Sequence, residues 1–219
     1  NYDYNRHFFI GHYFRDNYEK ALKNLPIVAS EVNLTKIEVW ITNKTGTTDN
    51  TRDIIAFMDL AETDSSEMNN HIMPISSNKH PYNKVNNLYD EVNVPNVRNT
   101  NTAITSLTGL GYQSNLDFEK TYARKLNQSE FNYHPQLGYI SLNQRLNPDE
   151  VLAVAYEYTY GGQTYQVGEL STDGAVGQEA LVLKLLKPTI TNPNNKIWDL
   201  MMKNVYSIGA YQLDQEGFR

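Results

Sequence analysis

The histidines are the side chains of this sequence with the widest chemical use, because imidazole serves as a metal ligand and as an acid–base group. The five histidines are His7, His12, His71, His80 and His134. No two of them are four residues apart, the spacing that places two zinc ligands on one face of a helix. His7 and His12 are five residues apart in a segment that resembles a strand, so we expect them on opposite faces. The sequence therefore predicts no metal site and no cofactor, and it gives each histidine a core or surface role.

Motifs for nucleophilic or phosphate chemistry are absent from the sequence. It has no G-x-S-x-G, so no nucleophile elbow, and no G-x-x-x-x-G-K-[ST], so no phosphate-binding loop. Gly109-Leu110-Gly111 lacks the third glycine and the preceding strand that a dinucleotide site needs. The chain has no cysteine, which excludes a thiol nucleophile, a disulfide and a thiolate metal site. We therefore predict no catalytic residue.

Carboxylates form two closely spaced pairs in the sequence, Asp149 with Glu150 and Asp59 with Glu62. Acid–base catalysis requires two carboxyl groups at a fixed distance across a cleft, which sequence proximity does not establish. We therefore expect these carboxylates on the solvated surface. The stretch 171–174, STDG, resembles half of a calcium loop, but the remaining ligand positions are missing, so we expect no calcium site there.

The composition indicates a folded protein with a hydrophobic core, and it argues against nucleic-acid binding and a membrane-spanning helix. Hydrophobic residues make up 40% of the 219 residues, which is enough to form a core. The formal net charge of -6 argues against a nucleic-acid partner. No apolar run approaches the roughly 20 residues of a membrane helix. The sequence starts with Asn1 rather than methionine, and we expect it to be a fragment of a longer protein.

A β-hairpin around Gly161-Gly162 is the clearest structural signal. Leu152 to Tyr160 alternates along a strand, and Gln163 to Val167 returns after a two-residue turn for which glycine supplies the positive φ. Counting outward from the turn pairs Tyr158 with Tyr165, and Tyr156 with Val167.

Other elements follow from hydrophobic spacing, caps and turns. We expect one short helix at Tyr18–Leu25, capped by Asp16 and stopped by Pro26, and another that contains Trp198 and ends near Gly209. We expect the strands at 34–42 and 52–60 to be antiparallel neighbours, and the segment 62–105 to be a long polar loop with less order than the strands. Position 117–126 fits either a strand or a short helix. Further strands are expected at 7–14, 139–142 and 180–187.

The pattern as a whole predicts a mainly β protein with a minor helical part. We expect antiparallel, sandwich-like modules with two short helices, and we place the boundary between them near residue 108. The first module is 1–108, with the short helix and the long polar loop. The second is 109–219, with the hairpin and the C-terminal helix.

Several stretches together resemble the SprA/Sov family of Bacteroidetes, the very large outer-membrane proteins of gliding motility and Type IX secretion. The longest is 133–169, YHPQLGYISLNQRLNPDEVLAVAYEYTYGGQTYQVGE. The others are RHFFIGHYFRDNYEKAL at 6–22, KIEVWITNKTG at 36–46, DIIAFMDL at 53–60, LKLLKP at 183–188 and WDLMMKNVYSIGAYQL at 198–213. The segment 62–105 contributes least to the resemblance.

The resemblance implies a soluble, non-enzymatic domain of a giant β-barrel translocon at the cell outer membrane, on either its extracellular or its periplasmic side. Its partners would be the remainder of the translocon, secretion-system subunits and cargo proteins, with no nucleic acid and no small-molecule substrate. Because the sequence lacks the alternating lipid-facing segments of a barrel wall, we expect a domain inserted between barrel strands. Such a domain should present an apolar contact surface, for which we nominate Phe8, Phe9, Tyr13, Trp198 and Met202.

Two other functions remain open on the residues alone. The 16 tyrosines suit a carbohydrate-binding or adhesion module at the cell surface, although packing within the hairpin also explains several of them. A glycan-active enzyme on a β-sandwich scaffold would require two buried carboxylates that face each other in a cleft.

Overall fold

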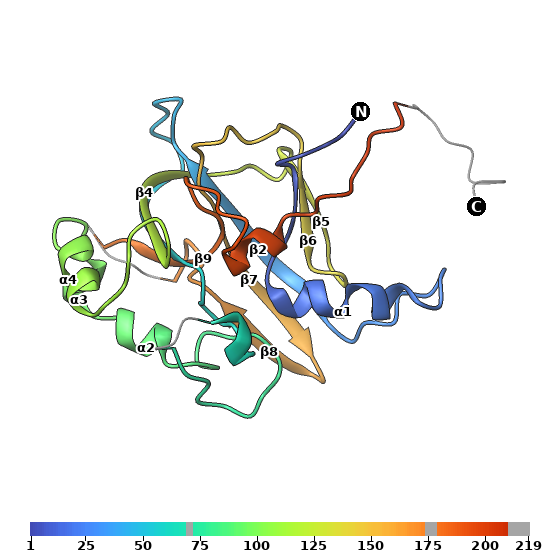
Figure 1. Cartoon of the computed structure of the whole chain (residues 1–219), viewed down its shortest axis with the longest axis horizontal. Helices are drawn as coiled ribbons and strands as arrows, with labels where there is room; N and C mark the ends of the chain where they lie inside the picture. The colour runs from blue at the N-terminus through green and yellow to red at the C-terminus, as the bar shows by residue number, and fades with distance from the viewer. Residues whose placement is uncertain (69–71, 174–178, 210–219) are drawn as a thin grey trace.

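The computed structural model describes residues 1–68, 72–173 and 179–209, and it is mainly β with a few short helices (Figure 1). The mainly β class expected from the sequence is confirmed. The strands in these ranges are β1 (His7–Phe9), β2 (Asn33–Thr42), β3 (Thr51–Phe57), β4 (Phe118–Lys125), β5 (Phe131–His134), β6 (Tyr139–Leu142), β7 (Leu152–Tyr160), β8 (Gln163–Val167) and β9 (Leu181–Lys187). The α-helices are α1 (His12–Leu22), α2 (Leu88–Val92), α3 (Pro95–Arg98) and α4 (Ala103–Gly109), and the 3-10 helices are η1 (Ser65–Glu67) and η2 (Lys196–Leu200).

Five strands close into a small barrel in the order β2-β4-β3-β9-β7, because β7 also pairs with β2. Each neighbouring pair is antiparallel except β3 with β9, which is parallel. The strand β8 extends the sheet beyond β7, and β1, β6 and β5 form a separate three-stranded sheet. This closed ring differs from the sandwich-like modules expected from the sequence, because the β2–β7 pairing joins the two edges that a sandwich would leave apart.

The ranges 1–108 and 109–219 share this barrel. The strands β2 and β3 come from the first range, whereas β4, β7 and β9 come from the second. The strand β3 lies between β4 and β9, so the first range has no strand pair of its own in the barrel. One hydrophobic core therefore includes residues from both predicted modules.

The hairpin prediction is confirmed in its register. Tyr158 lies opposite Tyr165, and Tyr156 lies opposite Val167. Gly161 and Gly162 have φ values of 57° and 78°, the left-handed region that glycine adopts without a steric cost. The strands at 139–142 and 180–187 are also confirmed as β6 and β9, and 117–126 forms the strand β4.

The expected pairing of the strands at 34–42 and 52–60 is wrong. The strand β4 lies between β2 and β3 and forms hydrogen bonds with both of them. Residues of β3 such as Ile54 and Ile55 are completely buried, which is typical of a strand with neighbours on both edges. Adjacency in the sequence suggested a hairpin, whereas closure of the ring required a strand from the second half of the chain.

The N-terminal strand is shorter than expected, and the helix begins earlier. β1 pairs with β6 only as far as Phe9 opposite Tyr139, where β6 begins, so the residues beyond Phe9 have no strand partner. The helix α1 then starts at His12, and Asp16 lies inside it rather than at its cap. Phe14 and Ala21, which are seven residues apart, both face the core at helical spacing.

The segment 62–105 contains η1, α2, α3 and the start of α4, which corrects the expectation of a loop with few apolar anchors. Its almost completely buried apolar side chains include Val85, Leu88, Val92 and Val97. Residues three or four apart on short helices reach the core, although they look scattered in the sequence. The positions 69–71 lie outside the described residues.

The C-terminal helix expected around Trp198 is limited to the single 3-10 turn η2. After it, the chain runs antiparallel to the N-terminal stretch, and the backbone hydrogen bonds go across to that stretch instead of along a helix. Met202 donates to His7 at 2.9 Å and Ser207 donates to Asn1 at 2.8 Å. The helices α3 and α4 lie on the opposite side of the molecule from α1 (Figure 1). None of the helices in the described ranges is both long and apolar enough to cross a membrane.

Candidate functional site

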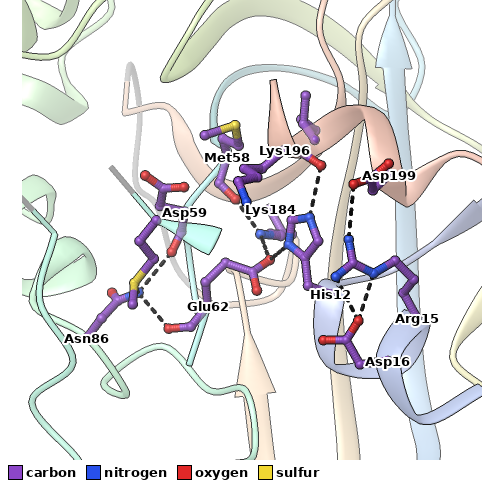
Figure 2. A network of polar contacts seen from close by, with 12 residues as sticks. His12, Arg15, Asp16, Met58, Asp59, Glu62, Asn86, Lys184, Lys196 and Asp199 are labelled. Atoms are coloured by element: carbon purple, nitrogen blue, oxygen red, sulfur yellow. Dashed lines mark hydrogen bonds and ion pairs between the residues drawn. The ribbon is translucent and has the colours of Figure 1, made fainter. Parts of the chain in front are cut away.

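A buried lysine on β9 lies at the centre of a buried cluster of polar side chains. Lys184 is only 1% exposed in a strand whose residues are all buried. A buried ammonium group requires acceptors, because its hydration is lost. Its Nζ atom donates to the backbone oxygen of Met58 and lies 2.5 Å from Oε1 of Glu62 (Figure 2).

His12 completes the cluster, which we call the triad: His12, Glu62 and Lys184. The Nδ1 atom of His12 lies 2.8 Å from Oε1 of Glu62, and its Nε2 atom lies 3.0 Å from the backbone oxygen of Lys196. A carbonyl oxygen and an ionised carboxylate only accept hydrogen bonds, so both ring nitrogens donate. The geometry therefore requires a protonated, positively charged imidazole beside Glu62.

The pKa values of Glu62 and His12 agree with this charge state. Burial alone would raise the pKa of Glu62, but the charges of Lys184 and His12 lower it to about 2. Burial alone would lower the pKa of His12, but the negative charge of Glu62 and its hydrogen bond produce a net rise. One buried carboxylate is thus held between two cations.

Asn86 fixes the loop that carries Glu62. This side chain is completely buried, and its amide nitrogen donates to the backbone oxygens of Asp59 and Glu62, at 2.9 Å and 3.0 Å (Figure 2). The triad therefore joins α1, the loop after β3 and the strand β9, while Asn86 ties in the segment before α2. Asp59 and Glu62 are 4% and 5% exposed, which corrects the expectation of solvated surface for this pair.

A second buried ion pair lies outside the triad. The guanidinium of Arg98, at the end of α3, contacts both carboxylate oxygens of Glu169, at 2.6 Å and 2.8 Å. Tyr89 donates its hydroxyl to the same carboxylate at 2.8 Å. This bidentate pair attaches the helical segment to the loop after β8.

Two of the residues nominated for a contact surface lie in the core. Phe8 and Phe9 are 1% and 8% exposed, because both faces of β1 are covered. Tyr13, Trp198 and Met202 are half-buried, and the ammonium of Lys203 lies 5.3 Å from the ring centre of Trp198. The structure does not gather these residues into one patch: Tyr13 borders a cavity beside α1, whereas Trp198 borders another beside β9.

An exposed aromatic cluster that the sequence did not indicate lies where the stretch 1–8 pairs with 201–207. Tyr2 and Tyr206 are 44% and 65% exposed, with ring centres 5.5 Å apart. Tyr4 is 5.8 Å from Tyr2 and carries the guanidinium of Arg145 at 3.9 Å over its ring. The pairing of these two stretches, which are about 200 residues apart in the sequence, creates this cluster.

The other predicted polar positions have structural partners. Asp149 forms an ion pair with Lys44, and Glu150 accepts the backbone N–H of Asn147 at 2.7 Å. Asp173, in the STDG stretch, accepts the backbone N–H of Leu170 at 2.8 Å, while Gly174 lies outside the described residues. Among the residues that the structure describes, no group of three or more histidine, aspartate or glutamate side chains is arranged to hold a metal ion.

The triad escaped sequence reasoning because its members are far apart in the chain. Glu62 lies 50 positions from His12 and 122 from Lys184. One signal was present: Lys184 interrupts the apolar run ALVLKLLK, and a lysine within a buried strand implies a buried partner.

No protein-family model matches the chain, and a search of curated proteins also found no match.

Proposed function

We propose that this chain is a non-enzymatic domain of a SprA/Sov-type outer-membrane translocon, the conduit of Type IX secretion and gliding motility. The resemblance of the six stretches is the basis of the proposal. These stretches form much of the framework of the fold, because they contain β1 and α1, most of β2, β3 and β9, half of β5, and all of β6, β7 and β8. Two triad residues, His12 and Lys184, also lie in them.

The pairing of the stretches 1–8 and 201–207 is the structural observation that supports an inserted domain. The N-terminal stretch 1–8 runs antiparallel to 201–207, with bridges between Tyr2 and Tyr206 and between Phe8 and Met201. Both stretches reach the same side of the molecule (Figure 1). A domain whose first and last paired stretches lie side by side can be inserted between two neighbouring strands without forcing them apart. The exposed ring cluster of Tyr2, Tyr4 and Tyr206 would then face the rest of the pore.

The internal pairing of the triad supports a structural role for it. Both nitrogens of His12 and the Nζ atom of Lys184 are bonded to protein acceptors. His12 and Lys184 are 2% and 1% exposed, so almost none of either side chain is accessible to a substrate. A catalytic acid or base needs hydrogen-bond access to its substrate.

The size and location of the native polypeptide test the proposal. An antibody raised against this chain should detect, in the outer-membrane fraction of the source cells, a polypeptide far larger than the 25.1 kDa of this sequence. An in-frame deletion of the coding region should block secretion of Type IX cargo while other outer-membrane proteins stay at normal abundance. Detection of a product near 25 kDa, or normal secretion after the deletion, would overturn the proposal.

A further inference from the structure

A cavity with a volume of about 960 Å³ lies beside the triad. Its walls come from α1, the stretch 29–31, the loop 62–65 and the end of β7. Protein sites for small ligands have volumes of about 300–1,000 Å³, so this cavity has room for a ligand of several rings. The residues that matter below are Tyr13, Glu31, Lys79, His80, Gln136 and Tyr160.

Three half-buried rings form an aromatic wall on one side of the cavity. The ring of His80 lies against Tyr160 with 3.7 Å between the ring centres, and Tyr13 meets His80 edge-on at 5.3 Å. Burial lowers the pKa of His80, which keeps the ring neutral at pH 7. A hydrogen bond to Glu31 raises the pKa of Tyr160, so its hydroxyl stays protonated. The wall is therefore uncharged, with apolar ring surface and polar edges.

The remaining lining offers hydrogen-bond donors and acceptors in similar measure. Lysine and amide groups donate, whereas carboxylates and hydroxyls accept. Glu62 reaches the cavity with its charge already compensated by His12 and Lys184. The other carboxylates are Asp16, Glu31 and Asp64, and they are opposed by Lys20 and Lys79. The lining has no strong excess of one sign, so it does not select a strongly charged ligand.

The His80 ring has unused hydrogen-bonding capacity. Its Nδ1 atom is buried and forms no hydrogen bond with the part of the chain that the structure describes. Buried polar atoms of folded proteins usually have a partner. After a small rotation of the His80 ring, a ligand hydroxyl beside it would supply a hydrogen-bond partner for Nδ1.

We propose that this cavity binds a short neutral oligosaccharide, with a sugar ring stacked on the wall formed by Tyr13, His80 and Tyr160. A sugar has an apolar C–H face and a rim of hydroxyls that both donate and accept, which matches an uncharged aromatic wall beside mixed polar groups. A basic peptide would instead require an excess of carboxylates. This proposal does not depend on the translocon assignment.

Saturation-transfer NMR on the full chain tests the proposal with maltotriose, cellotriose, chitotriose, xylotriose and mannotriose as probes. At least one trisaccharide should bind with a dissociation constant of about 1 mM or tighter, and salt should change the affinity little because no charges are paired. Tyr160→Ala should weaken binding about tenfold, which corresponds to roughly 1.4 kcal/mol of lost stacking. Glu31→Gln, a change at an exposed position, should weaken it less and serves as a second cavity variant if Tyr160→Ala unfolds the hairpin.

Tyr206→Ala is the matched control, because it removes an exposed tyrosine that does not line the cavity. It should leave binding unchanged. Absence of a signal with all five sugars, or an equal loss of binding in Tyr206→Ala and the cavity variants, would overturn the proposal. Salt-sensitive binding of pentalysine that competes for the cavity would also overturn it and would assign the site to basic peptides.

Discussion

At the scale of single residues, the triad shows how the fold tolerates charge in its core. Glu62 is shared by two cations, and each cation also donates to a backbone oxygen of another segment. Such a group can cost as much in lost hydration as it returns in attraction, so its presence does not by itself increase stability. Removal of one member, however, leaves uncompensated charge in a dry environment.

We predict that Glu62→Gln lowers the free energy of unfolding by about 3–5 kcal/mol, because His12 and Lys184 lose their shared counter-charge. Urea denaturation monitored by circular dichroism measures the change. Lys36→Gln is the control, since Lys36 is 60% exposed in its 3.1 Å pair with Glu157 and should cost less than about 1 kcal/mol. Equal effects of the two changes would show that the triad is not a buried charge cluster.

The triad also predicts a pH optimum of stability. The pKa of His12 is raised in the folded state, so its contribution is complete below about pH 6.5 and is lost as the pH rises through the folded value. The pKa of Glu62 is lowered to about 2, so its contribution is complete above the unfolded value of 4.5 and is lost as the pH falls toward 2. Melting temperatures measured from acidic to alkaline pH should therefore be highest between these limits.

His80 acts in the opposite direction, because its lowered pKa favours folding above about pH 6.5. The contribution of His12 is therefore obtained by comparison with the variant His12→Gln. The decline above neutral pH should be smaller in this variant than in the parent chain. A decline of the same size in both would refute the assignment to His12.

At the scale of elements, tight turns next to packed side chains are the positions where a substitution should reduce stability most. Gly138 has a φ of 61°, and a β-carbon at this position would lie 2.0 Å from the ring of Phe14. Gly162 also has a positive φ, but a β-carbon there would contact nothing within 4 Å. Substitution of Gly162 therefore costs only backbone conformational energy, whereas substitution of Gly138 adds a steric collision.

We predict that Gly162→Val costs on the order of 1–2 kcal/mol through its backbone conformation alone. Gly138→Ala should cost more, because about 1–3 kcal/mol for the collision with Phe14 adds to a similar backbone cost. Chemical denaturation of both variants tests the order. If Gly162→Val is the more damaging change, the hairpin turn has packing that the structure does not show.

Elements with local signals could be predicted from the sequence. The hairpin register followed from alternation around Gly161-Gly162, and β6 and β9 followed from short apolar runs. The start of α1 could not be predicted, because the aromatic run HFFIGHYF fits a strand equally well. The strand stops at Phe9 only because its partner β6 extends no further than Tyr139. The strands that pair with β3 could not be predicted either, because one of them, β9, lies more than 100 residues later in the chain and pairs in parallel.

At the scale of the whole molecule, closure of the barrel makes the two halves of the chain interdependent. β3 takes both of its neighbours from the second half, and β7 takes one neighbour, β2, from the first. A boundary near residue 108 looked plausible in the sequence because polar residues gather before it. Pairing between distant strands is not encoded by local composition, so the shared core could not be predicted.

We therefore predict one cooperative unfolding transition for the full chain and no folded state for 1–108 or 109–219 expressed alone. Each fragment would expose barrel edges and half of a hydrophobic core. Proton–nitrogen correlation spectra should be dispersed for the full chain and collapsed for both fragments. A dispersed spectrum from either fragment would restore the idea of two independent modules.

The pairing of the stretches 1–8 and 201–207 has a mechanical consequence. Pulling Asn1 and Ser207 apart loads the bridge between Tyr2 and Tyr206 before the one between Phe8 and Met201, so the hydrogen bonds open one after another like a zipper. Each such bond contributes only about 1 kcal/mol, whereas the barrel strands carry no load until the zipper has opened. Tension from flanking segments would therefore lengthen the tether by several residues on each side while the folded ring stays intact. The end pair would act as an extensible joint.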